Sequence, residues 1–217
     1  MSRKVLNEEI LTLNLTYTGK ITQQQLERHL WDAADILRGK IDSGDFKHYI
    51  FGLLFFKRLC DVWQEEYDER LKLYQDEELA KDPEEHRFHI PPGAFWDDIR
   101  KSSTNIGERL NIAFRAIEDA NTRLRGVFQD VDFNNKERFP DAALELLLQH
   151  FSKYRLRNCD VEADVLGAAY EYLIAKFADD AGKKGGEFYT PKMVTRLIVT
   201  CLQPDEGMTT YDPTCGS

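Results

Sequence analysis

Two short segments of the 217-residue chain combine residue types that suit a small anionic ligand. The first, GGEFYTPK, covers residues 185–192, and the second, DPTCGS, covers residues 212–217. Thr190 followed by Pro191 is typical of a helix N-terminus, whose unpaired N–H groups and positive dipole end favour a carboxylate or phosphate. A β-prone run, MTTY over 208–211, precedes the second segment, and small residues after a strand let a ligand approach the backbone. The two segments predict a ligand site between a helix N-terminus and a strand-end loop.

The same residues also allow a plainer interpretation. A Gly-Gly pair ahead of a capped helix is more often a linker, and a single Asp-Pro turn after a strand is no more specific. Phe188 and Tyr189 could supply apolar or stacking surface. The residue types alone leave both interpretations open.

The elements that must position these segments are predicted to be helices. Thr22 and Gln25 form a predicted capping box, with Ile21 and Leu26 as the flanking apolar pair. From residue 46 to 67, apolar residues recur every three or four positions and cover nearly all faces of the middle of the segment. This pattern predicts a central, mostly buried helix that emerges into solvent from Gln64 onward.

Later helices are predicted from their start and stop signals. Asn105 with Glu108 reads as a second capping box, Phe139-Pro140 as a helix start, and Asp160 as the cap of the following helix. Gly126 is expected to end the helix that Asn105 begins. Residues 75–93 are charged and rich in proline, which predicts a loop.

A sharp change of composition at GKKGG, residues 182–186, predicts a domain boundary or hinge. The predicted organisation is an N-terminal arm over 1–20, a helical domain over 21–181, and a hinge with the start of an α/β domain over 182–217. The predicted fold class is therefore mainly α, a helical bundle followed by the beginning of a Rossmann-like α/β unit. The helix after the boundary carries a clean apolar stripe of Met193, Val194, Leu197, Ile198 and Cys201.

Composition limits the class of protein. The net charge of −9 argues against a general polyanion-binding surface, so a nucleic-acid role would need local basic patches or a more basic partner. No apolar run is long enough to cross a membrane, and the N-terminal MSRKVLNEEI lacks the apolar core of a signal peptide. Four widely spaced cysteines read as reduced thiols. A soluble cytoplasmic protein without membrane contact is expected.

Several other side chains have a structural and a functional interpretation. His86 and His89 have HxxH spacing, but without a third ligand no metal is expected. Cys60 lies among apolar neighbours and is expected in the core. The tryptophans are expected to pack rather than to stack on a ligand; they are Trp31, Trp63 and Trp96.

The basic pairs are read in the same way. Lys57-Arg58 interrupts an apolar helix, and its side chains either extend past apolar surface to solvent or contact DNA or a partner. The pairs Arg100-Lys101 and Arg123-Arg125 are further candidates for contacts with DNA phosphates.

Specific sequence motifs distinguish between these structural and functional interpretations. GEFYTP, an amphipathic helix and YDPTCGS together resemble the N6-adenine DNA methyltransferases of type I restriction-modification systems, specifically their modification subunit. The resemblance continues upstream and covers nearly the whole chain. It includes LWDAADILRG, YIFGLLFFKRLCDVWQEE, NIGERLNIAFRAIEDAN and DVLGAAYEYLI.

The resemblance implies S-adenosyl-L-methionine as cofactor and no metal. It implies one cofactor wall that consists of Glu187, Phe188, Tyr189, Thr190, Pro191 and Lys192. It implies a second wall, beside the methionine half, that consists of Asp212, Pro213, Cys215, Gly216 and Ser217. The helix N-terminus at Thr190-Pro191 would receive the methionine carboxylate, and Gly185-Gly186 would let the first wall move.

The chain also departs from the family pattern. The further glycines after Ser217, the acidic residue that holds the ribose, and the Asn-Pro-Pro-aromatic motif that grips a flipped adenine are not in the sequence. A base must leave the stack and enter a pocket for this chemistry. We therefore expect no catalytic residue in this chain, weak or no cofactor binding, no methylation by the chain alone, and poor order over 185–217.

The implied partners are a DNA specificity subunit, a second modification subunit, a restriction subunit and double-stranded DNA. In such a complex the helical domain would serve assembly and DNA clamping. Two alternatives remain at this point. One is a non-enzymatic helical interaction module, and the other is part of a fused single-chain restriction-methyltransferase.

Overall fold

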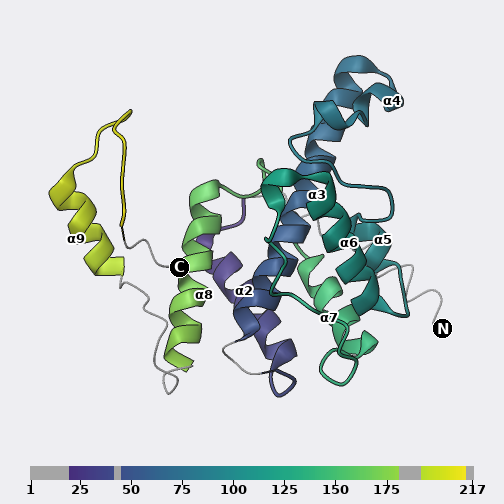
Figure 1. Cartoon of the computed structure of the whole chain (residues 1–217), viewed down its shortest axis with the longest axis horizontal. Helices are drawn as coiled ribbons and strands as arrows, with labels where there is room; N and C mark the ends of the chain where they lie inside the picture. Colours follow the sequence, from purple (N-terminus) through teal and green to yellow (C-terminus); the bar gives the residue numbers. More distant parts are fainter. Residues whose placement is uncertain (1–19, 42–44, 181–191, 214–217) are drawn as a thin grey trace.

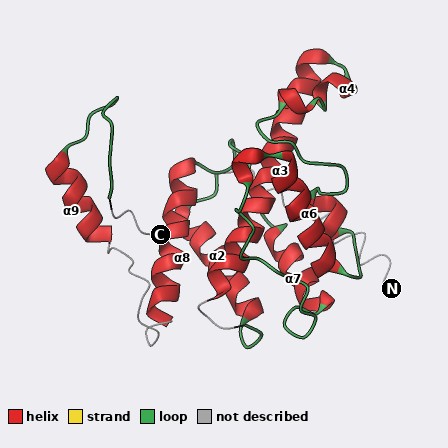
Figure 2. Ribbon diagram, in the orientation of Figure 1, coloured by secondary structure: helices red, strands yellow, loops and turns green. Residues whose placement is uncertain are grey.

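The computed structural model describes residues 20–41, 45–180 and 192–213, and every regular element in these ranges is a helix (Figures 1 and 2). The α-helices are α2 (Gln23–Leu37), α3 (Phe46–Tyr74), α4 (Glu77–Ala80), α5 (Trp96–Arg100), α6 (Ile106–Ala120), α7 (Asp141–Phe151), α8 (Ala163–Asp180) and α9 (Lys192–Leu202). Short 3-10 turns are η2 (Pro83–Glu85) and η3 (Thr122–Leu124). None of the described helices is long and apolar enough to cross a membrane.

The helix α3 is the centre of the bundle. It contacts α2, α5, α7 and α8, and its inner half carries fully buried Ile50, Leu53 and Phe56. Its outer half, from Gln64 onward, projects beyond the other helices together with α4 (Figure 1). The expectation of a central buried helix that emerges into solvent is confirmed.

The helix α2 packs against α7 and α8 and closes the other side of the bundle. Its predicted capping box is present: the Gln25 N–H donates to Thr22 Oγ1 at 3.3 Å, and the Thr22 N–H donates to Gln25 Oε1 at 2.9 Å. Ile21 and Leu26, the apolar pair that flanks the cap, are both buried. The local signal therefore fixed this helix start correctly.

Aromatic side chains fill the space between α3, α6 and the 128–139 segment. Phe114 stacks on Phe128 with ring centroids 4.1 Å apart, and Phe133 meets Phe139 edge-on at 5.1 Å. Gly107 permits this packing, because a Cβ there would lie 2.2 Å from the carbonyl oxygen of Phe133. Only glycine allows the two backbones to approach so closely.

Two predicted helix caps are wrong. Asn105 has φ 54° and makes no side-chain cap; instead the Asp141 carboxylate accepts from the N–H groups of Asn105 and Ile106 at 3.0 and 2.9 Å. The last predicted helix of the bundle begins at Ala163, not after Asp160, because Asp160 is held by Arg157 at 2.6 Å. In both places a contact from elsewhere in the fold replaces the local one.

The predicted stop and loop also differ from the structure. The helix α6 ends at Ala120, and Gly126 lies beyond it at φ 83° in a turn. The predicted loop over 75–93 contains α4 and η2, each capped by an aspartate: Asp76 accepts from two N–H groups and Asp82 from one. These short helical turns are part of the projection that α3 begins.

The Rossmann-like start of an α/β unit is not seen in the described residues. Residues 208–211 form no strand, and Tyr211 is 86% exposed. A strand requires a neighbour to pair its backbone groups, and the described part of the chain offers none to this run. The helical part of the predicted fold class is confirmed. The predicted arm over 1–20 lies outside the described residues except for residue 20, and the predicted boundary over 182–186 lies outside them as well.

Candidate functional site

The predicted cofactor walls fall mostly outside the described residues. Glu187, Phe188, Tyr189, Thr190 and Pro191 of the first wall lie outside them, and so do Cys215, Gly216 and Ser217 of the second. Of the remaining positions, Lys192 begins α9, while Asp212 and Pro213 are exposed. The predicted helix after this segment is present, and the proximity of the two walls stays a prediction.

The helix α9 presents its predicted apolar stripe to solvent. Met193, Leu197 and Leu202 are 74%, 64% and 72% exposed, and Val194 and Ile198 are exposed as well. α9 stands apart from the bundle in Figure 1. The sequence pattern is that of a helix that buries one face, and no described element covers this face.

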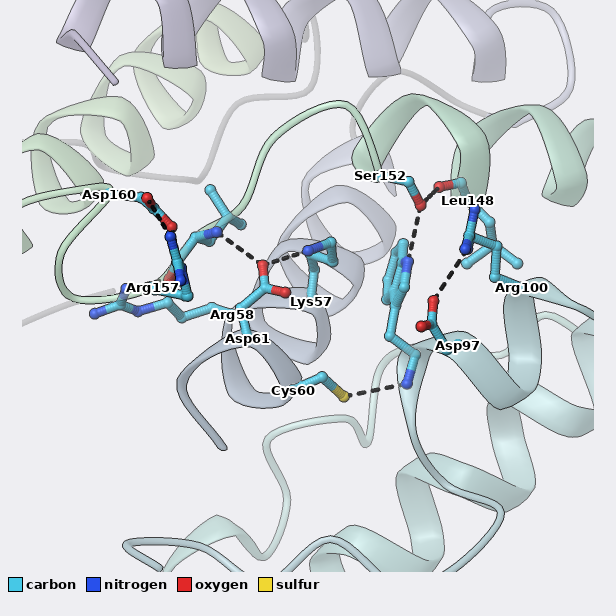
Figure 3. A network of polar contacts seen from close by, with 12 residues as sticks. Lys57, Arg58, Cys60, Asp61, Asp97, Arg100, Leu148, Ser152, Arg157 and Asp160 are labelled. Atoms are coloured by element: carbon cyan, nitrogen blue, oxygen red, sulfur yellow. Dashed lines mark hydrogen bonds and ion pairs between the residues drawn. The ribbon is translucent and has the colours of Figure 1, made fainter. Parts of the chain in front are cut away.

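A buried ion pair lies on the inner half of α3. Lys57 is only 5% exposed and forms an ion pair with Asp61, one turn later on the same helix (Figure 3). Asp61 also accepts the Leu156 N–H at 2.7 Å. The Lys57 ammonium lies 5.8 Å from the ring centre of Trp96. Lys57 therefore does not extend to solvent, and that predicted interpretation is wrong. The alternative, a contact with DNA or a partner, stays a prediction.

Burial shapes the ionisation of this pair and its neighbour. Removal from water raises the pKa of the Asp61 carboxyl, and the Lys57 charge opposes that rise. Burial likewise raises the pKa of the Cys60 thiol, which stays protonated at neutral pH and accepts the Trp96 N–H at 3.3 Å. Cys60 is a core residue, as predicted.

Arg58 and Glu65 tie α3 to the turn that precedes α8. The Arg58 guanidinium donates to the Leu156 carbonyl and, at 2.5 Å, to Asn158 Oδ1. The Glu65 carboxylate accepts from the N–H groups of Asn158 and Cys159 at 2.7 and 3.0 Å. Arg58 thus connects α3 to this turn and is not directed only to solvent, whereas its predicted contact with DNA or a partner stays a prediction.

A second anchor joins α5 to α7. The Trp96 indole N–H donates to Ser152 Oγ at 3.0 Å, and Ser152 Oγ donates to the Leu148 carbonyl at 2.7 Å. Figure 3 shows Ser152 and Leu148 beside the Asp97–Arg100 ion pair, which measures 3.1 Å. Trp96 is buried and packs on Phe56, with ring centres 5.4 Å apart. Its predicted packing role is confirmed.

A cleft of about 840 Å³ opens above this network. Its wall combines the Lys57–Asp61 pair with aromatic and charged side chains of α3 and α5. They include Trp63, Tyr67, Asp68, Phe95, Trp96 and Asp98. This cleft was not predicted from the sequence. The Lys57-to-Asp61 spacing of four on an apolar helix was the one available signal for its floor.

The histidines do not form a metal site in the described part of the chain. His86 is buried, stacks on Trp63 with ring centres 4.5 Å apart, and bonds through Nε2 to the Ala80 carbonyl at 2.8 Å. The His89 N–H donates to Asn121 Oδ1 at 2.9 Å. Among the described residues no group of three or more His, Cys, Asp or Glu side chains could hold a metal ion.

The remaining basic candidates for DNA contact lie at the surface. Arg100 is partly engaged with Asp97, whereas Lys101, Arg123 and Arg125 are exposed. None of these last three forms an ion pair with a residue that the structure describes. They stay available for a contact with a polyanion.

Comparison with known proteins gives a consistent result. Residues 26–151 match the HsdM N-terminal domain family, and residues 161–217 match the N-6 DNA Methylase family. The boundary between the two matches falls ahead of α8, although α8 packs closely on α2 within the bundle.

The similar proteins are methylase subunits. The type I restriction enzyme MjaIX methylase subunit of Methanocaldococcus jannaschii is 31% identical over 213 residues, which cover 89% of this chain and 38% of that protein. The MpnII methylase subunit of Mycoplasma pneumoniae is 29% identical over 245 residues, covering 91% and 44%. The chain spans about two fifths of the length of these relatives.

A solved structure of a similar protein agrees with these family matches. The crystal structure of the type I restriction-modification system methyltransferase subunit from Streptococcus thermophilus superposes with a TM-score of 0.66 at 31% identity, and the match covers 83% of this chain and 44% of that one. These matches favour the methylase-subunit interpretation over a non-enzymatic helical interaction module. The chain belongs to the HsdM family of type I restriction-modification methylase subunits and corresponds to their N-terminal part.

Proposed function

We propose that this chain supplies the helical domain and the first cofactor-binding segments of a subunit that transfers a methyl group from S-adenosyl-L-methionine to adenine N6 in DNA. The match of residues 161–217 to the N-6 DNA Methylase family carries the proposal, because this stretch contains both FYTP and DPTCGS. The proposed partners are a DNA specificity subunit, a second modification subunit, a restriction subunit and double-stranded DNA, all in the cytoplasm.

The proposed cofactor site fits the residue types that form it. α9 begins at Lys192 and is a regular helix of 11 residues, so its first N–H groups have no partner within the helix and can receive a carboxylate. Thr190 and Pro191 would set this helix start, and Phe188 with Tyr189 would supply apolar surface. Asp212 would present an acceptor from the opposite wall, while Gly216 would let the methionine half approach the backbone. The bound cofactor supplies an electrophilic methyl group on sulfur.

The helical domain over 21–181 would position DNA and partner subunits. Lys101, Arg123 and Arg125 are the exposed cations proposed to face phosphates. The target sequence would be read by the specificity subunit, which agrees with the acidic balance of this chain. The 217 residues contain no adenine-gripping motif, so we propose that they do not methylate DNA by themselves.

Calorimetric titration with S-adenosyl-L-methionine tests the cofactor site. In the modification subunit that contains these residues, Asp212→Ala is expected to weaken cofactor binding at least tenfold, whereas Asp119→Asn on α6 should leave it unchanged. Equal binding by both variants would remove Asp212 from the site. Tight binding by residues 1–217 alone would contradict the proposal that this chain supplies only part of the pocket.

A further inference from the structure

The outer half of α3 begins a projection, here called the finger and defined as residues 64–87 (Figure 1). It consists of the last turns of α3 together with α4 and η2, and it extends away from the bundle (Figure 1). The Glu85 carboxylate accepts from Arg70 Nε at 2.8 Å and from the Tyr74 hydroxyl at 2.9 Å. These contacts hold the segment around Glu85, which leads back toward the bundle after α4, against α3.

A column of stacked side chains fixes the base of the finger. Trp63 lies between Tyr67, at 5.5 Å between ring centres, and His86, at 4.5 Å. The Lys81 ammonium lies 6.0 Å from the ring centre of Tyr67 and extends the column. The finger is therefore specifically ordered, although most of its surface contributes nothing to the core of the bundle.

The finger is strongly acidic. It carries ten Asp and Glu residues against four Lys and Arg residues. Glu69, Glu78 and Glu84 are exposed and form no ion pair with any residue that the structure describes. Phosphates would be repelled from this surface, whereas Lys and Arg side chains would be attracted to it.

The finger also exposes apolar side chains near its tip. Leu73 is 69% exposed, Leu79 is 52% exposed, and Tyr74 is 37% exposed. Acidic groups around exposed leucines are the complement of a protein surface that carries basic groups around apolar side chains.

The cleft of about 840 Å³ lies along one side of the finger base. Trp63 and Tyr67 line it from the α3 side, and Phe95 and Trp96 line it from the α5 side. Four cations of its wall are engaged with carboxylates: Lys57 with Asp61, Lys81 with Glu77, Arg100 with Asp97, and Arg157 with Asp160. Arg155, the fifth cation of the wall, is exposed and forms no ion pair with a residue that the structure describes. Asp98 is exposed and has no ion pair with a described residue. The Asp68 carboxylate accepts from the neutral Gln64 side-chain amide at 2.8 Å and also forms no ion pair with a residue that the structure describes.

We propose that the finger and this cleft form a docking surface for a segment of a partner protein that carries Lys or Arg side chains beside apolar ones. The apolar side chains of the segment would enter the aromatic cleft and cover Leu73 and Leu79. Its cations would pair with Asp68, Asp98 and the free glutamates of the finger. This surface is separate from the proposed DNA-facing cations and does not depend on methyl transfer by the subunit.

The probe for this surface is a synthetic 16-residue peptide of alternating lysine and leucine, with a glutamate-leucine peptide and a 20-base-pair duplex as counterparts. Binding to the 217-residue chain is measured by tryptophan fluorescence and by the NMR shift of the Trp63 indole. The lysine-leucine peptide is expected to bind and to move the Trp63 signal. The glutamate-leucine peptide and the duplex are expected to leave that signal in place.

Two charge-matched variants separate a site from general attraction. The triple variant Asp68→Asn, Asp98→Asn, Glu69→Gln is expected to bind the lysine-leucine peptide at least tenfold more weakly. The triple variant Asp119→Asn, Glu145→Gln, Glu108→Gln changes the net charge equally on α6 and α7 and should retain binding within twofold. The double variant Leu73→Ser, Leu79→Ser leaves the net charge unchanged and is expected to bind the peptide at least threefold more weakly. Equal losses in the two triple variants, no binding of the peptide, or an equal Trp63 shift with the duplex would overturn the proposal.

Discussion

The helices of the bundle and the helix α9 both carry regular apolar stripes, but the stripes of the bundle are buried and that of α9 is exposed. In the bundle, the apolar stripes of α2, α3, α6 and α7 meet one another, and each contains side chains that are less than 2% exposed: Leu30, Phe56, Leu110 and Leu147. α9 has an equally regular stripe, but Met193 and Leu202 are more than 70% exposed. Periodicity predicts which face of a helix should be buried; whether the face is buried depends on what the rest of the fold brings to it.

Polar contacts separate the two regions in the same way. Within the bundle, Arg58 and Glu65 reach residues almost a hundred positions later, and His150 Nε2 bonds to the His29 carbonyl at 2.7 Å. In α9 the Thr200 hydroxyl makes a local bond, which it donates to the Arg196 carbonyl at 2.7 Å. Long-range bonds make the bundle a cooperative unit, so changes in the bundle should cost far more than changes in α9.

The largest effect is expected from breaking the buried ion pair. Asp61→Ala leaves the Lys57 ammonium and the Leu156 N–H without their acceptor, and it should destabilise the bundle by about 3–5 kcal/mol. Urea unfolding followed by circular dichroism measures this. The double variant Lys57→Met, Asp61→Leu removes both charges and should recover most of the loss. If the double variant is less stable than Asp61→Ala, the pair is not the cause.

The same truncation in each region should give unequal results. Leu147→Ala on α7 empties a fully buried position and should cost about 2–5 kcal/mol of unfolding free energy. Leu197→Ala on α9 removes a side chain that is 64% exposed and should change the stability of the bundle by less than about 0.5 kcal/mol. Comparable losses would mean that α9 folds with the bundle.

Acid should weaken the bundle through its α2–α7 contact. Burial first, and then the charges of His150, Lys153 and Lys57, lower the pKa of His29 from 6.5 to about 3. The folded state therefore binds fewer protons than the unfolded state below pH 6.5. Stability should fall from pH 6.5 toward pH 3, by up to about 1.4 kcal/mol per pH unit.

The window from pH 6.5 to 4.5 reduces the contribution of the unfolded chain's carboxylates, which titrate mainly below it. Burial also lowers the pKa of His150, which adds to the loss in the same direction. His29→Gln should flatten the dependence of unfolding free energy on pH in this window. A variant whose pH dependence equals that of the parent would show that His29 titrates normally.

The smallest expected effect is at the start of α2. Thr22→Ala removes an acceptor for the Gln25 N–H and should cost about 1 kcal/mol. Thr22→Ser keeps the oxygen and should cost a few tenths at most. Thermal unfolding of the two variants is the measurement, and equal melting temperatures would show that the capping box is not stabilising.

Sequence patterns correctly predicted the structural features that depend on residues only a few positions apart. The Thr22 cap, the buried middle of α3 and the Pro140 start all follow from spacing within a few positions. The cap of α6 could not be found locally, because Asp141 supplies it from 35 residues further along the chain. Lys57 was read as solvent-directed because nothing in its own helix shows that α5 and the 156–160 turn cover it.

The candidate cofactor site was predicted by a different route. The strings FYTP and DPTCGS carry family information, and the comparisons agree with it, but the residues do not reveal their own geometry. The geometry of a site that two loops form depends on the sheet that joins the loops. No described strand holds Asp212 against the start of α9. The cleft beside the finger was not predicted, because it arises between elements that are distant in the sequence.

Native-state hydrogen exchange of the 217-residue chain measures the contrast between the bundle and α9 most directly. Amides of α2, the inner half of α3, and α7 should exchange only with global unfolding, at the free energy found by urea. Amides of α9 should exchange with protection of less than about 2 kcal/mol and should not respond to Asp61→Ala. Protection of α9 equal to that of α3, lost in parallel on Asp61→Ala, would contradict the separation of the two regions.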